Sequence, residues 1–302
     1  MNKIKKIIRI LLDRKFRFYF LTSCGFYNYW SDEKFLKRKY KLILGHSLNL
    51  KNPTLFSEKL QWLKLHDRKP IYTTMVDKYE AKKYVANIIG EQYIIPTLGV
   101  WDKFEDIDFN KLPNQFVLKC THDSGGLVIC RDKRKFDVKA AKKKINRSLK
   151  RNYFWQGREW PYKNVKPRVI AEKYMEDAQS GELKDYKFFC FNGMPKFMYI
   201  SNDRGMIPHT DFFDMNKASL SFRLKDPPSP RKPSIPKQFE KMKNLAILLS
   251  KDIPCVRVDF YIVAEKIYFG ELTFFHNGGF TKFTPCEWDK TIGSWLELPK
   301  IK

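Results

Sequence analysis

The stretch 256–279, near the C-terminal end, constrains the fold of this chain most strongly. In its first half, apolar side chains alternate with polar ones such as Arg257 and Asp259, which is the period of a half-buried β-strand. A polar tip centred on Glu265 follows, and a second strand begins after it. The residues expected on one face of this second strand are Ile267, Phe269, Glu271 and Thr273. The pattern predicts an antiparallel β-hairpin.

Two carboxylates face each other in this hairpin. A tip at Glu265 brings Asp259 opposite Glu271, and Arg257 then lies one pleat away. Directly opposed side chains are roughly 4.5–5.5 Å apart at Cβ, so the two like charges repel unless a cation lies near them. One interpretation is a divalent cation with oxygen ligands, Mg²⁺ or Mn²⁺, whose bound phosphate would meet the arginine. The other is an ordinary hairpin with an arginine–carboxylate cluster at its rim.

The charge of the chain indicates an anionic partner. Among 302 residues, Lys and Arg number 58 and Asp and Glu number 33, which gives a formal net charge of +25. Such an excess suits nucleic acid, a membrane surface, an acidic polymer or a phosphorylated substrate, and it does not choose among them. Six scattered cysteines without a CxxC pair are typical of free thiols in a reducing compartment, and no apolar run reaches transmembrane length. We therefore expect a cytoplasmic protein.

The first 17 residues predict a basic amphipathic helix. Apolar side chains recur at helical spacing at Ile4, Ile7, Ile8, Leu11 and Leu12. Lysines and arginines fill the positions between them, a composition that suits anionic lipid. One interpretation is a peripheral position on the inner face of the membrane. The other is a helix packed on the protein's own core, with a solvated basic face.

A loop of small residues separates two further strands. Residues 116–120 alternate as a strand in which Lys119 points away from the apolar side chains, and 127–130 form the next strand. The sequence between them, Thr-His-Asp-Ser-Gly-Gly, can close its backbone N–H groups over a phosphate. Most loops of this composition are only turns, so both interpretations stay open.

Two more lysines are candidates for binding an anion. Asp77 and Glu80 form a helix-capping pattern, which sets Lys78 at the first helical position against the helix dipole. An anionic ligand would remove that conflict. Lys187 projects from the first strand of a hairpin that turns at an Asn-Gly pair.

Eight segments occur in an order that resembles the TupA-like ATP-grasp family, named for teichuronopeptide synthesis. The segments are NPTLFSEKLQWLKL (52–65), DKYEAKKYV (77–85), IGEQYIIPTLGV (89–100), LPNQFVLKCTHDSGG (112–126), RVIAEKYM (168–175), DYKFFCFNG (185–193), VRVDFY (256–261) and YFGELTFFHNGGF (268–280). A trailing TPCEWDKTIGSWLEL (284–298) also fits. The resemblance implies an α+β ATP-grasp fold, in which two lobes clamp ATP. The expected organisation is a basic amphipathic segment at 1–30, a mainly helical region at 31–112, a lid lobe at 113–170 and a C-terminal lobe with the metal site at 171–302.

The resemblance also implies a role for each site residue. The ATP phosphates would be bound by Lys78, Lys119, Lys187 and the lid residues Ser124, Gly125 and Gly126. The adenine and ribose would be bound by Glu172, Lys173 and Asp185. Mg²⁺ or Mn²⁺ would be held by Asp259, Glu271 and Asn277, because Thr273 replaces the asparagine that many ATP-grasp enzymes carry two residues after the second carboxylate. Catalysis would rest on Lys119 and on Arg257, which would stabilise the transferred phosphoryl group.

The function that the resemblance implies is an ATP-dependent carboxylate–amine ligase of cell-surface polysaccharide synthesis. It would join an amino acid or amine to a uronic acid through an acyl phosphate, with an acidic polysaccharide or its precursor as partner. The triplet Asp106-Ile107-Asp108 keeps open an alternative, a metal-dependent glycosyltransferase of capsule or lipopolysaccharide synthesis. No specific nucleic-acid partner is expected, because the chain lacks the aromatic–basic interleaving of the recognised modules.

Overall fold

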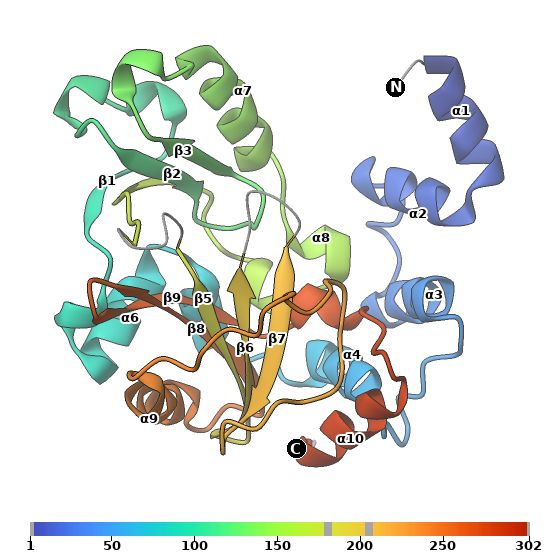
Figure 1. Ribbon diagram of the computed structural model, residues 1–302. Coiled ribbons are helices and arrows are strands. Elements are labelled where there is room, and N and C mark those ends of the chain that lie inside the picture. Colours follow the sequence, from blue (N-terminus) through green and yellow to red (C-terminus); the bar gives the residue numbers. More distant parts are fainter. Residues whose placement is uncertain (1–2, 178–182, 203–207, 301–302) are drawn as a thin grey trace.

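Helices and strands build two separate antiparallel sheets with helices around them (Figure 1). The computed structural model describes residues 3–177, 183–202 and 208–300. Its α-helices are α1 (Lys3–Leu12), α2 (Arg14–Ser23), α3 (Asp32–Leu44), α4 (Phe56–His66), α5 (Ile71–Val76), α6 (Glu80–Ile89), α7 (Val138–Leu149), α8 (Phe154–Gly157), α9 (Phe239–Ser250) and α10 (Glu287–Trp295). Its strands are β1 (Thr97–Trp101), β2 (Phe116–Cys120), β3 (Leu127–Cys130), β4 (Val169–Lys173), β5 (Asp185–Phe191), β6 (Met194–Asn202), β7 (His209–Asp214), β8 (Cys255–Val263) and β9 (Lys266–Thr273). The α+β class expected from the sequence is confirmed.

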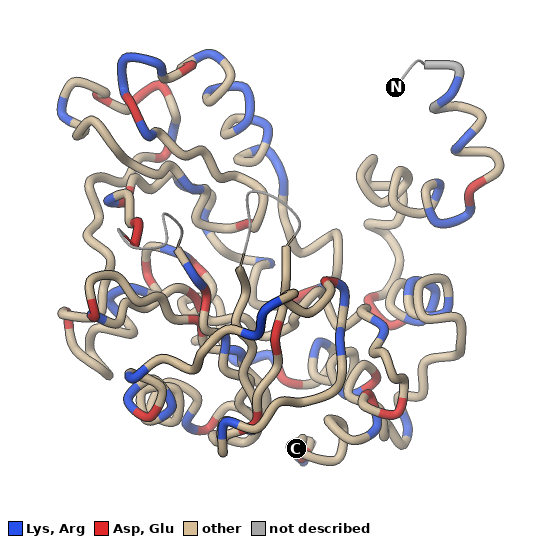
Figure 2. Tube along the Cα trace, in the orientation of Figure 1, with Lys and Arg blue, Asp and Glu red and all other residues tan. Residues whose placement is uncertain are grey.

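The smaller sheet has four strands in the order β1–β4–β2–β3. Helix α7 packs on β2 and β3, and the core of this lobe contains Phe116, Leu118 and Ile145, all fully buried. The remaining positions of α7 are mostly lysines, so the helix is largely blue in Figure 2 and its basic face is solvated. Since β1 and β4 belong to this sheet, the lobe extends beyond 113–170 on both sides.

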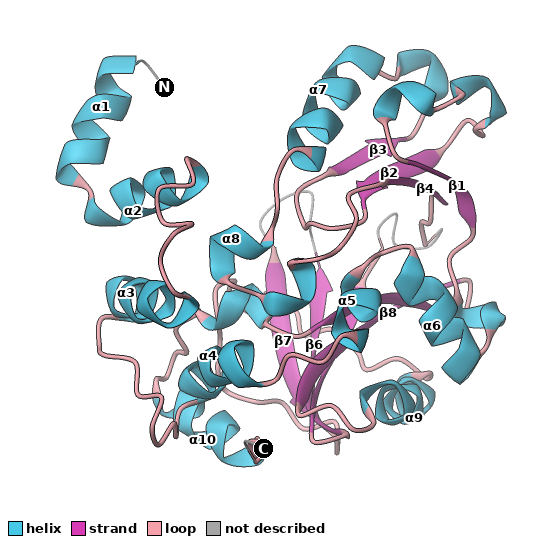
Figure 3. Cartoon of the chain, turned by 180° about the vertical axis from the view of Figure 1, so that it is seen from behind, coloured by secondary structure: helices cyan, strands magenta, loops and turns pink. Residues whose placement is uncertain are grey.

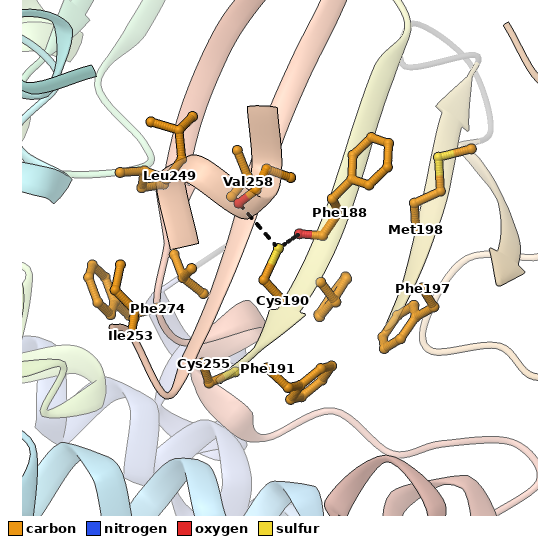
Figure 4. Close-up of a cluster of buried hydrophobic side chains, with 14 of the residues drawn as sticks. Phe188, Cys190, Phe191, Phe197, Met198, Leu249, Ile253, Cys255, Val258 and Phe274 are labelled. Carbon is orange, nitrogen blue, oxygen red and sulfur yellow. Dashed lines mark hydrogen bonds between the residues drawn. The ribbon is translucent and has the colours of Figure 1, made fainter. Parts of the chain in front are cut away.

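The larger sheet has five strands in the order β7–β6–β5–β8–β9. Its central strand β5 is buried along its whole length, and helix α9 packs on β5, β6 and β8. Figure 4 shows part of this layer, in which Phe188, Val258 and Leu249 lie together and the Cys190 thiol is 3.9 Å from the Phe188 carbonyl oxygen. Burial on both faces explains why the apolar run in β5 lacks a clean alternation.

Helices α4, α5 and α6 share the hydrophobic core of the larger sheet. Near the start of α4, Ser57 donates to both carboxylate oxygens of Asp289 in α10, through its backbone N–H (2.8 Å) and its hydroxyl (2.6 Å). A Cβ at Gly293 of α10 would lie 2.2 Å from the Thr54 carbonyl oxygen, so glycine permits this close approach. The helical region before β1 and the end of the chain therefore pack as one body.

Helix α1 lies apart from both lobes in Figures 1 and 3, with α2 as its neighbour. Phe18 of α2 is buried against Tyr27 and Phe35, which attaches α2 to the body of the protein. The side chains of Ile7, Ile8, Leu11 and Leu12 in α1 are exposed, up to 79% for Leu12. The interpretation of this segment as a helix packed on the protein's own core is therefore wrong for α1. Among the described helices, none combines the length and the apolar character that crossing a membrane requires.

Candidate active site

A cavity of about 250 Å³ lies between the two sheets. Its positive groups come from both sheets, from α6 and from the segment before α6: Lys119, Lys187, Lys82 and Lys78. Its carboxylates are those of Asp123, Glu172, Asp185 and Glu271. Ser124 and Gly126, from the loop between β2 and β3, complete the polar lining. Eight of the residues that the sequence analysis selected from distant segments thus surround one space, and the cavity lining does not include Gly125, Lys173, Arg257, Asp259 and Asn277.

Glu172 of β4 holds two lysines at one end of the cavity. Its Oε1 lies 2.5 Å from the Lys82 Nζ, and its Oε2 lies 2.5 Å from the Lys119 Nζ. Burial alone would raise the pKa of this carboxyl group, but the two ammonium charges outweigh burial and lower the pKa to about 2. Lys82 was missed by the sequence analysis, because nothing in the sequence distinguishes it from Lys83. Glu172 is therefore ionised, and it fixes where both ammonium groups lie.

Arg257 of β8 connects the groups on the opposite side of the cavity. Its guanidinium donates to both oxygens of Asp259 and to Glu271 Oε1, each at 2.7 Å, and to Thr273 Oγ1 at 3.0 Å. It also lies 2.6 Å from His276 Nδ1. Burial, together with the charge of the arginine, holds the pKa of this imidazole well below its usual range, so the neutral ring accepts a hydrogen bond. The arginine–carboxylate cluster is thus present, and the metal role of the two carboxylates stays a prediction.

The register of the β8–β9 hairpin brings Asp259 opposite Glu271, as predicted. The turn, however, consists of two residues with positive φ, Ala264 and Glu265, whereas a tip centred on Glu265 would have three residues, 264–266. A β-bulge at Gly270 adds one residue to the second strand and restores the predicted register at the carboxylates. A Cβ at Gly270 would lie 3.1 Å from the Asp259 carbonyl oxygen, so the bulge suits glycine.

The same bulge changes which side chains share a face. Phe269 pairs with Phe260 in the hydrophobic core, whereas Glu271 lies on the side of Arg257 and the cavity. The prediction that Ile267, Phe269, Glu271 and Thr273 share one face was therefore wrong. Without a bulge, strict alternation would have held along the strand.

Lys187 of β5 extends the arginine cluster toward the cavity. Its Nζ lies 3.0 Å from Asp185 Oδ1 and also contacts Asp259 Oδ2. Burial would lower the pKa of this ammonium group, but Asp259 outweighs burial and the pKa is raised. Asp259 is therefore a fully buried anion with two cationic partners, Lys187 and Arg257.

Lys78 connects the cavity to the loop between β2 and β3. Its backbone N–H donates to the Thr121 carbonyl oxygen (3.1 Å), and its Nζ donates to the Asp123 carbonyl oxygen. Helix α6 begins at Glu80, so Lys78 precedes the helix. The prediction that Lys78 is the first helical residue was therefore wrong. The predicted capping pattern is also wrong, because the residue before the helix is Tyr79 and Glu80 is the first helical residue. Asp77 Oδ1 nevertheless accepts from the backbone N–H groups of Tyr79 (2.8 Å) and Glu80 (3.3 Å). The position of Lys78 thus follows from its contacts with the loop and from the turn that Asp77 stabilises.

The loop between β2 and β3 is anchored over most of its length. Residues 121–123 are buried, and Asp123 Oδ1 accepts from the Gly126 backbone N–H at 3.0 Å. Only Ser124 and Gly125 are exposed, at the side of the cavity. The part of the loop that can close on a phosphate is therefore its two-residue tip.

The two glycines of this loop should respond differently to substitution. A Cβ at Gly126 would lie 2.5 Å from Cys120 Sγ and 2.8 Å from Ser148 Oγ, whereas a Cβ at Gly125 would meet only Asp123 Oδ2, at 3.9 Å. We expect Gly126→Ala to lower the free energy of unfolding by about 2 kcal/mol through overpacking, and Gly125→Ala to have little effect. Chemical denaturation of both variants measures this. Equal stability of the two would contradict the packing described.

A second hollow of about 240 Å³ adjoins the cavity and shares Lys119 and Glu172 with it. Much of its wall is apolar, from Ile95, Val117, Leu127, Ile129, Met175 and Leu183. Lys173, predicted to bind the nucleotide base, also lines it, and its backbone N–H donates to the Pro96 carbonyl oxygen at 3.0 Å. Size and apolar walls suit a flat aromatic base, so the predicted adenine position is compatible with this hollow.

Glu271 is the carboxylate that fits a Mg²⁺ sharing its coordination with phosphate oxygens. Its side chain is 42% exposed and lines the cavity, whereas Asp259 is fully buried and both its oxygens accept from Arg257. Within the described residues, no cluster of three or more His, Cys, Asp or Glu could hold a metal ion. Mg²⁺ commonly takes one or two carboxylates and completes its shell with water and phosphate, so Glu271 suits such an ion, and Asp259 would have to exchange Arg257 for the metal to take part.

Asn277 does not join these carboxylates in the structure. It is exposed, and its amide lies 3.1 Å from His276 Nε2. Thr273 is the residue at the carboxylates, because its hydroxyl donates to Glu271 Oε1 at 3.1 Å. The structure therefore does not bring Asn277 to the carboxylates, and the residue beside them is Thr273, in the position where the family pattern has asparagine.

The triplet Asp106-Ile107-Asp108 lies on the surface of the smaller lobe. Both aspartates are exposed and the isoleucine is buried, and Asp108 caps a short 3₁₀ turn by accepting from the Asn110 backbone N–H at 3.0 Å. Neither aspartate lines the cavity. The triplet therefore has a local structural role and lies outside the candidate site.

Three of the solved structures that match this chain are the following. D-alanine–D-alanine ligase from Bacillus anthracis, complexed with ATP, is 17% identical over 72% of this chain and 55% of that chain, with a TM-score of 0.38. D-cycloserine synthetase DcsG is 16% identical over 76% of this chain and 67% of that chain (TM-score 0.39). The ATP-grasp ligase PsnB, complexed with minimal precursor, Mg and ADP, is 8% identical over 72% and 57% (TM-score 0.38). The chain thus spans little more than half the length of the first of these ligases.

The sequence itself decides the family. No protein of curated function matches it. The profile of the family described as TupA-like ATPgrasp matches residues 58–297, well over half of the chain. This range contains both sheets and the lining of the cavity between them. The chain therefore belongs to the TupA-like ATP-grasp family.

Proposed function

We propose that this chain is an ATP-dependent carboxylate–amine ligase that joins an amino acid or amine to a uronic acid of a cell-surface polysaccharide or its precursor. Family membership supports the use of ATP. The observation that carries the proposal is the cavity, in which four lysines from separate elements face Glu271 across a space of about 250 Å³. A polyphosphate with its metal needs such a set of cations and a carboxylate around it.

The proposed reaction has two steps. In the first, a carboxylate oxygen of the uronic acid attacks the γ-phosphorus of ATP, the bond to the bridging oxygen breaks, and ADP leaves with that electron pair. In the second, the amine attacks the acyl carbon, the bond to the phosphate oxygen breaks, and the products are an amide, phosphate and a proton. Lys78, Lys119 and Arg257 would stabilise the charge on the transferred phosphoryl group. Mg²⁺, when bound, would neutralise charge on the β- and γ-phosphates.

The ion pairs of the cavity support fast chemistry through preorganisation. Glu172 holds the ammonium groups of Lys82 and Lys119, while Asp259 orients the guanidinium of Arg257 in a bidentate contact. Cations fixed in this way need not reorganise as charge develops on the phosphoryl group. Lysine side chains that were free in solvent would first have to be ordered at an entropic cost.

A basic hollow supports an anionic acceptor. It has a volume of about 540 Å³, and Lys184, Arg231 and Lys232 line it together with Asn202. Lys184 immediately precedes Asp185, which lines the ATP cavity and starts β5 next to the end of β6. Residues of the hollow and of the cavity therefore meet at the same end of β5 and β6.

Charge removal in this hollow tests the acceptor. We expect Arg231→Ala with Lys232→Ala to raise the KM for a galacturonic acid oligomer about tenfold, since attraction to its carboxylates weakens. The matched control is Arg223→Ala with Lys225→Ala, which removes the same charges from exposed positions outside the hollow. Steady-state ADP release gives both KM values, and the KM for ATP should not change. An equal rise in the control would refute the acceptor site and leave the ligase proposal standing.

The nucleotide products test the reaction class. Turnover should require ATP with Mg²⁺, a uronic acid and an amine together, and it should release ADP and phosphate. Omitting the amine should leave only slow ADP release, as the acyl phosphate hydrolyses. Separate assays of ADP and AMP with varied acid and amine measure this. AMP as the main product, or sugar transfer from a UDP-sugar without ATP, would contradict the proposal and favour adenylation or the glycosyltransferase alternative.

A further inference from the structure

The first 30 residues expose an unusual amount of apolar surface. Sixteen large hydrophobic side chains of the described residues are exposed, and seven of them lie in this segment: Ile7, Ile8, Leu11, Leu12, Tyr19, Phe26 and Tyr29. Leu11 is 66% exposed and Leu12 is 79% exposed. Leaving such side chains in water is unfavourable, because removing apolar surface from water is a main driving force of folding and association. A surface of this kind marks an interaction site.

The exposed apolar side chains of α1 form one face of the helix. Ile7, Ile8, Leu11 and Leu12 follow the i, i+1, i+4, i+5 spacing of an apolar stripe, whereas Lys5 and Arg9 fall outside it. No acidic residue lies in the first turn, and the nearest carboxylate, Asp13, caps α2 by accepting from its backbone N–H groups. The stripe is therefore bordered by positive charge.

The helix is presented by an element that is itself firmly held. Arg158, fully buried, donates to the Tyr27 carbonyl oxygen (2.6 Å) and lies 3.3 Å from Asp32 Oδ1. Phe18 of α2 packs on Phe35 in the same region. These contacts fix α2 to the body of the protein, while α1 projects beyond it (Figure 1).

We propose that α1 is a binding surface for an anionic lipid bilayer, on which the helix lies with Ile7, Ile8, Leu11 and Leu12 among the headgroups and acyl chains. Charge complementarity carries the choice of partner: Lys5 of α1 and Arg14 and Lys15 at the start of α2 are exposed and would meet lipid phosphates, whereas Arg9 lies 3.5 Å from Asp13 Oδ2. The segment lies outside the family match at 58–297, so the surface is independent of the catalytic cavity. Its failure and that of the proposed ligase activity are therefore distinguishable.

Binding to vesicles tests the apolar stripe. The full chain should sediment with vesicles of phosphatidylcholine containing about 30% phosphatidylglycerol, and Ile8→Ser/Leu11→Ser/Leu12→Ser should lower the partition coefficient by about tenfold or more. The matched control is Ile88→Ser/Met194→Ser/Leu248→Ser, which removes three exposed apolar side chains elsewhere and should bind as wild type. ADP release should be unchanged in both, which shows that the variants fold. Equal binding by the α1 variant would overturn the proposal.

Charge variants test the choice of lipid. Lys5→Gln/Arg14→Gln/Lys15→Gln should bind the anionic vesicles at least about tenfold less, because each basic side chain near such a surface adds roughly fivefold to binding. Lys139→Gln/Lys143→Gln/Lys144→Gln on the exposed face of α7 is the control and should bind as wild type. Equal binding of wild type to pure phosphatidylcholine would overturn the anionic specificity. A wild-type dimer that the serine substitutions dissociate, without vesicle binding, would assign the stripe to a second copy of this chain instead.

Discussion

Asp259→Asn should abolish ATP turnover and also destabilise the protein, by about 3 kcal/mol. The carboxylate is fully buried and accepts from Arg257 and Lys187. Its replacement by a neutral amide leaves these two buried cations without the negative charge that offsets the cost of removing them from water. Like-charge repulsion between Asp259 and Glu271 would by itself make the substitution stabilising. The structure reverses that sign, because Arg257 bridges the two carboxylates. Turnover should fall by at least about a hundredfold, since the guanidinium loses its bidentate orientation.

The control for this prediction is a carboxylate away from the cavity. Asp289→Asn weakens the contacts with Ser57 that join α10 to α4, so it should lower stability while ADP release continues. Urea denaturation gives the free energies of unfolding, and ADP release at a temperature where both variants are folded gives the rates. Wild-type stability of Asp259→Asn would contradict the role of Asp259 as a buried anion between Arg257 and Lys187.

Glu172→Gln should lower the free energy of unfolding at neutral pH by about 3 kcal/mol and remove a pH dependence. The folded-state pKa of Glu172 is about 2, below the ordinary value of 4.5. The carboxylate therefore contributes stability that is fully present above pH 4.5 and is lost as the pH falls toward 2. The stability difference between wild type and variant should accordingly be largest at neutral pH and shrink across this window.

Glu105→Gln is the matched control for Glu172→Gln. Hydrogen bonds from Lys142, the backbone and Asn146 lower the pKa of Glu105 to about 2 as well, but this side chain is exposed. Solvent screens exposed ion pairs, so its replacement should leave stability nearly unchanged. Urea titrations between pH 2 and 7 compare the two variants with wild type. Equal effects would show that burial of Glu172 between its two lysines does not determine its contribution.

The elements of the site could be predicted where local pattern decides them. Alternating apolar residues identified β2, β8 and β9, and the pairing of Asp259 with Glu271 was correct. The reasoning behind this pairing was incomplete. The turn is one residue shorter than expected, and the extra residue of the bulge at Gly270 restores the expected register. Which side chains of β9 face the core could not be predicted, since a bulge depends on the fit of two strands.

Other features depend on tertiary contacts that leave no local signal. Strands β1 and β7 lie at sheet edges and were not predicted, and Lys82 became recognisable only when Glu172 lay beside it. The role expected for Asn277 was transferred from a family pattern, and the position of its side chain depends on the backbone near His276. The side-chain set of a site therefore emerges from the assembled fold, although its backbone elements can be recognised beforehand.

The charges that line the cavity have a consequence for how a nucleotide enters. Four ammonium groups and four carboxylates line it, so the walls are formally neutral before any ligand arrives. ATP cannot simply add attractive contacts, because a phosphate that takes Lys119 or Lys187 competes with Glu172 or Asp185 for it. Binding is then an exchange of partners, whose free energy is the difference between two sets of ion pairs. A metal ion held by the displaced carboxylates would couple the affinity for nucleotide to the affinity for metal.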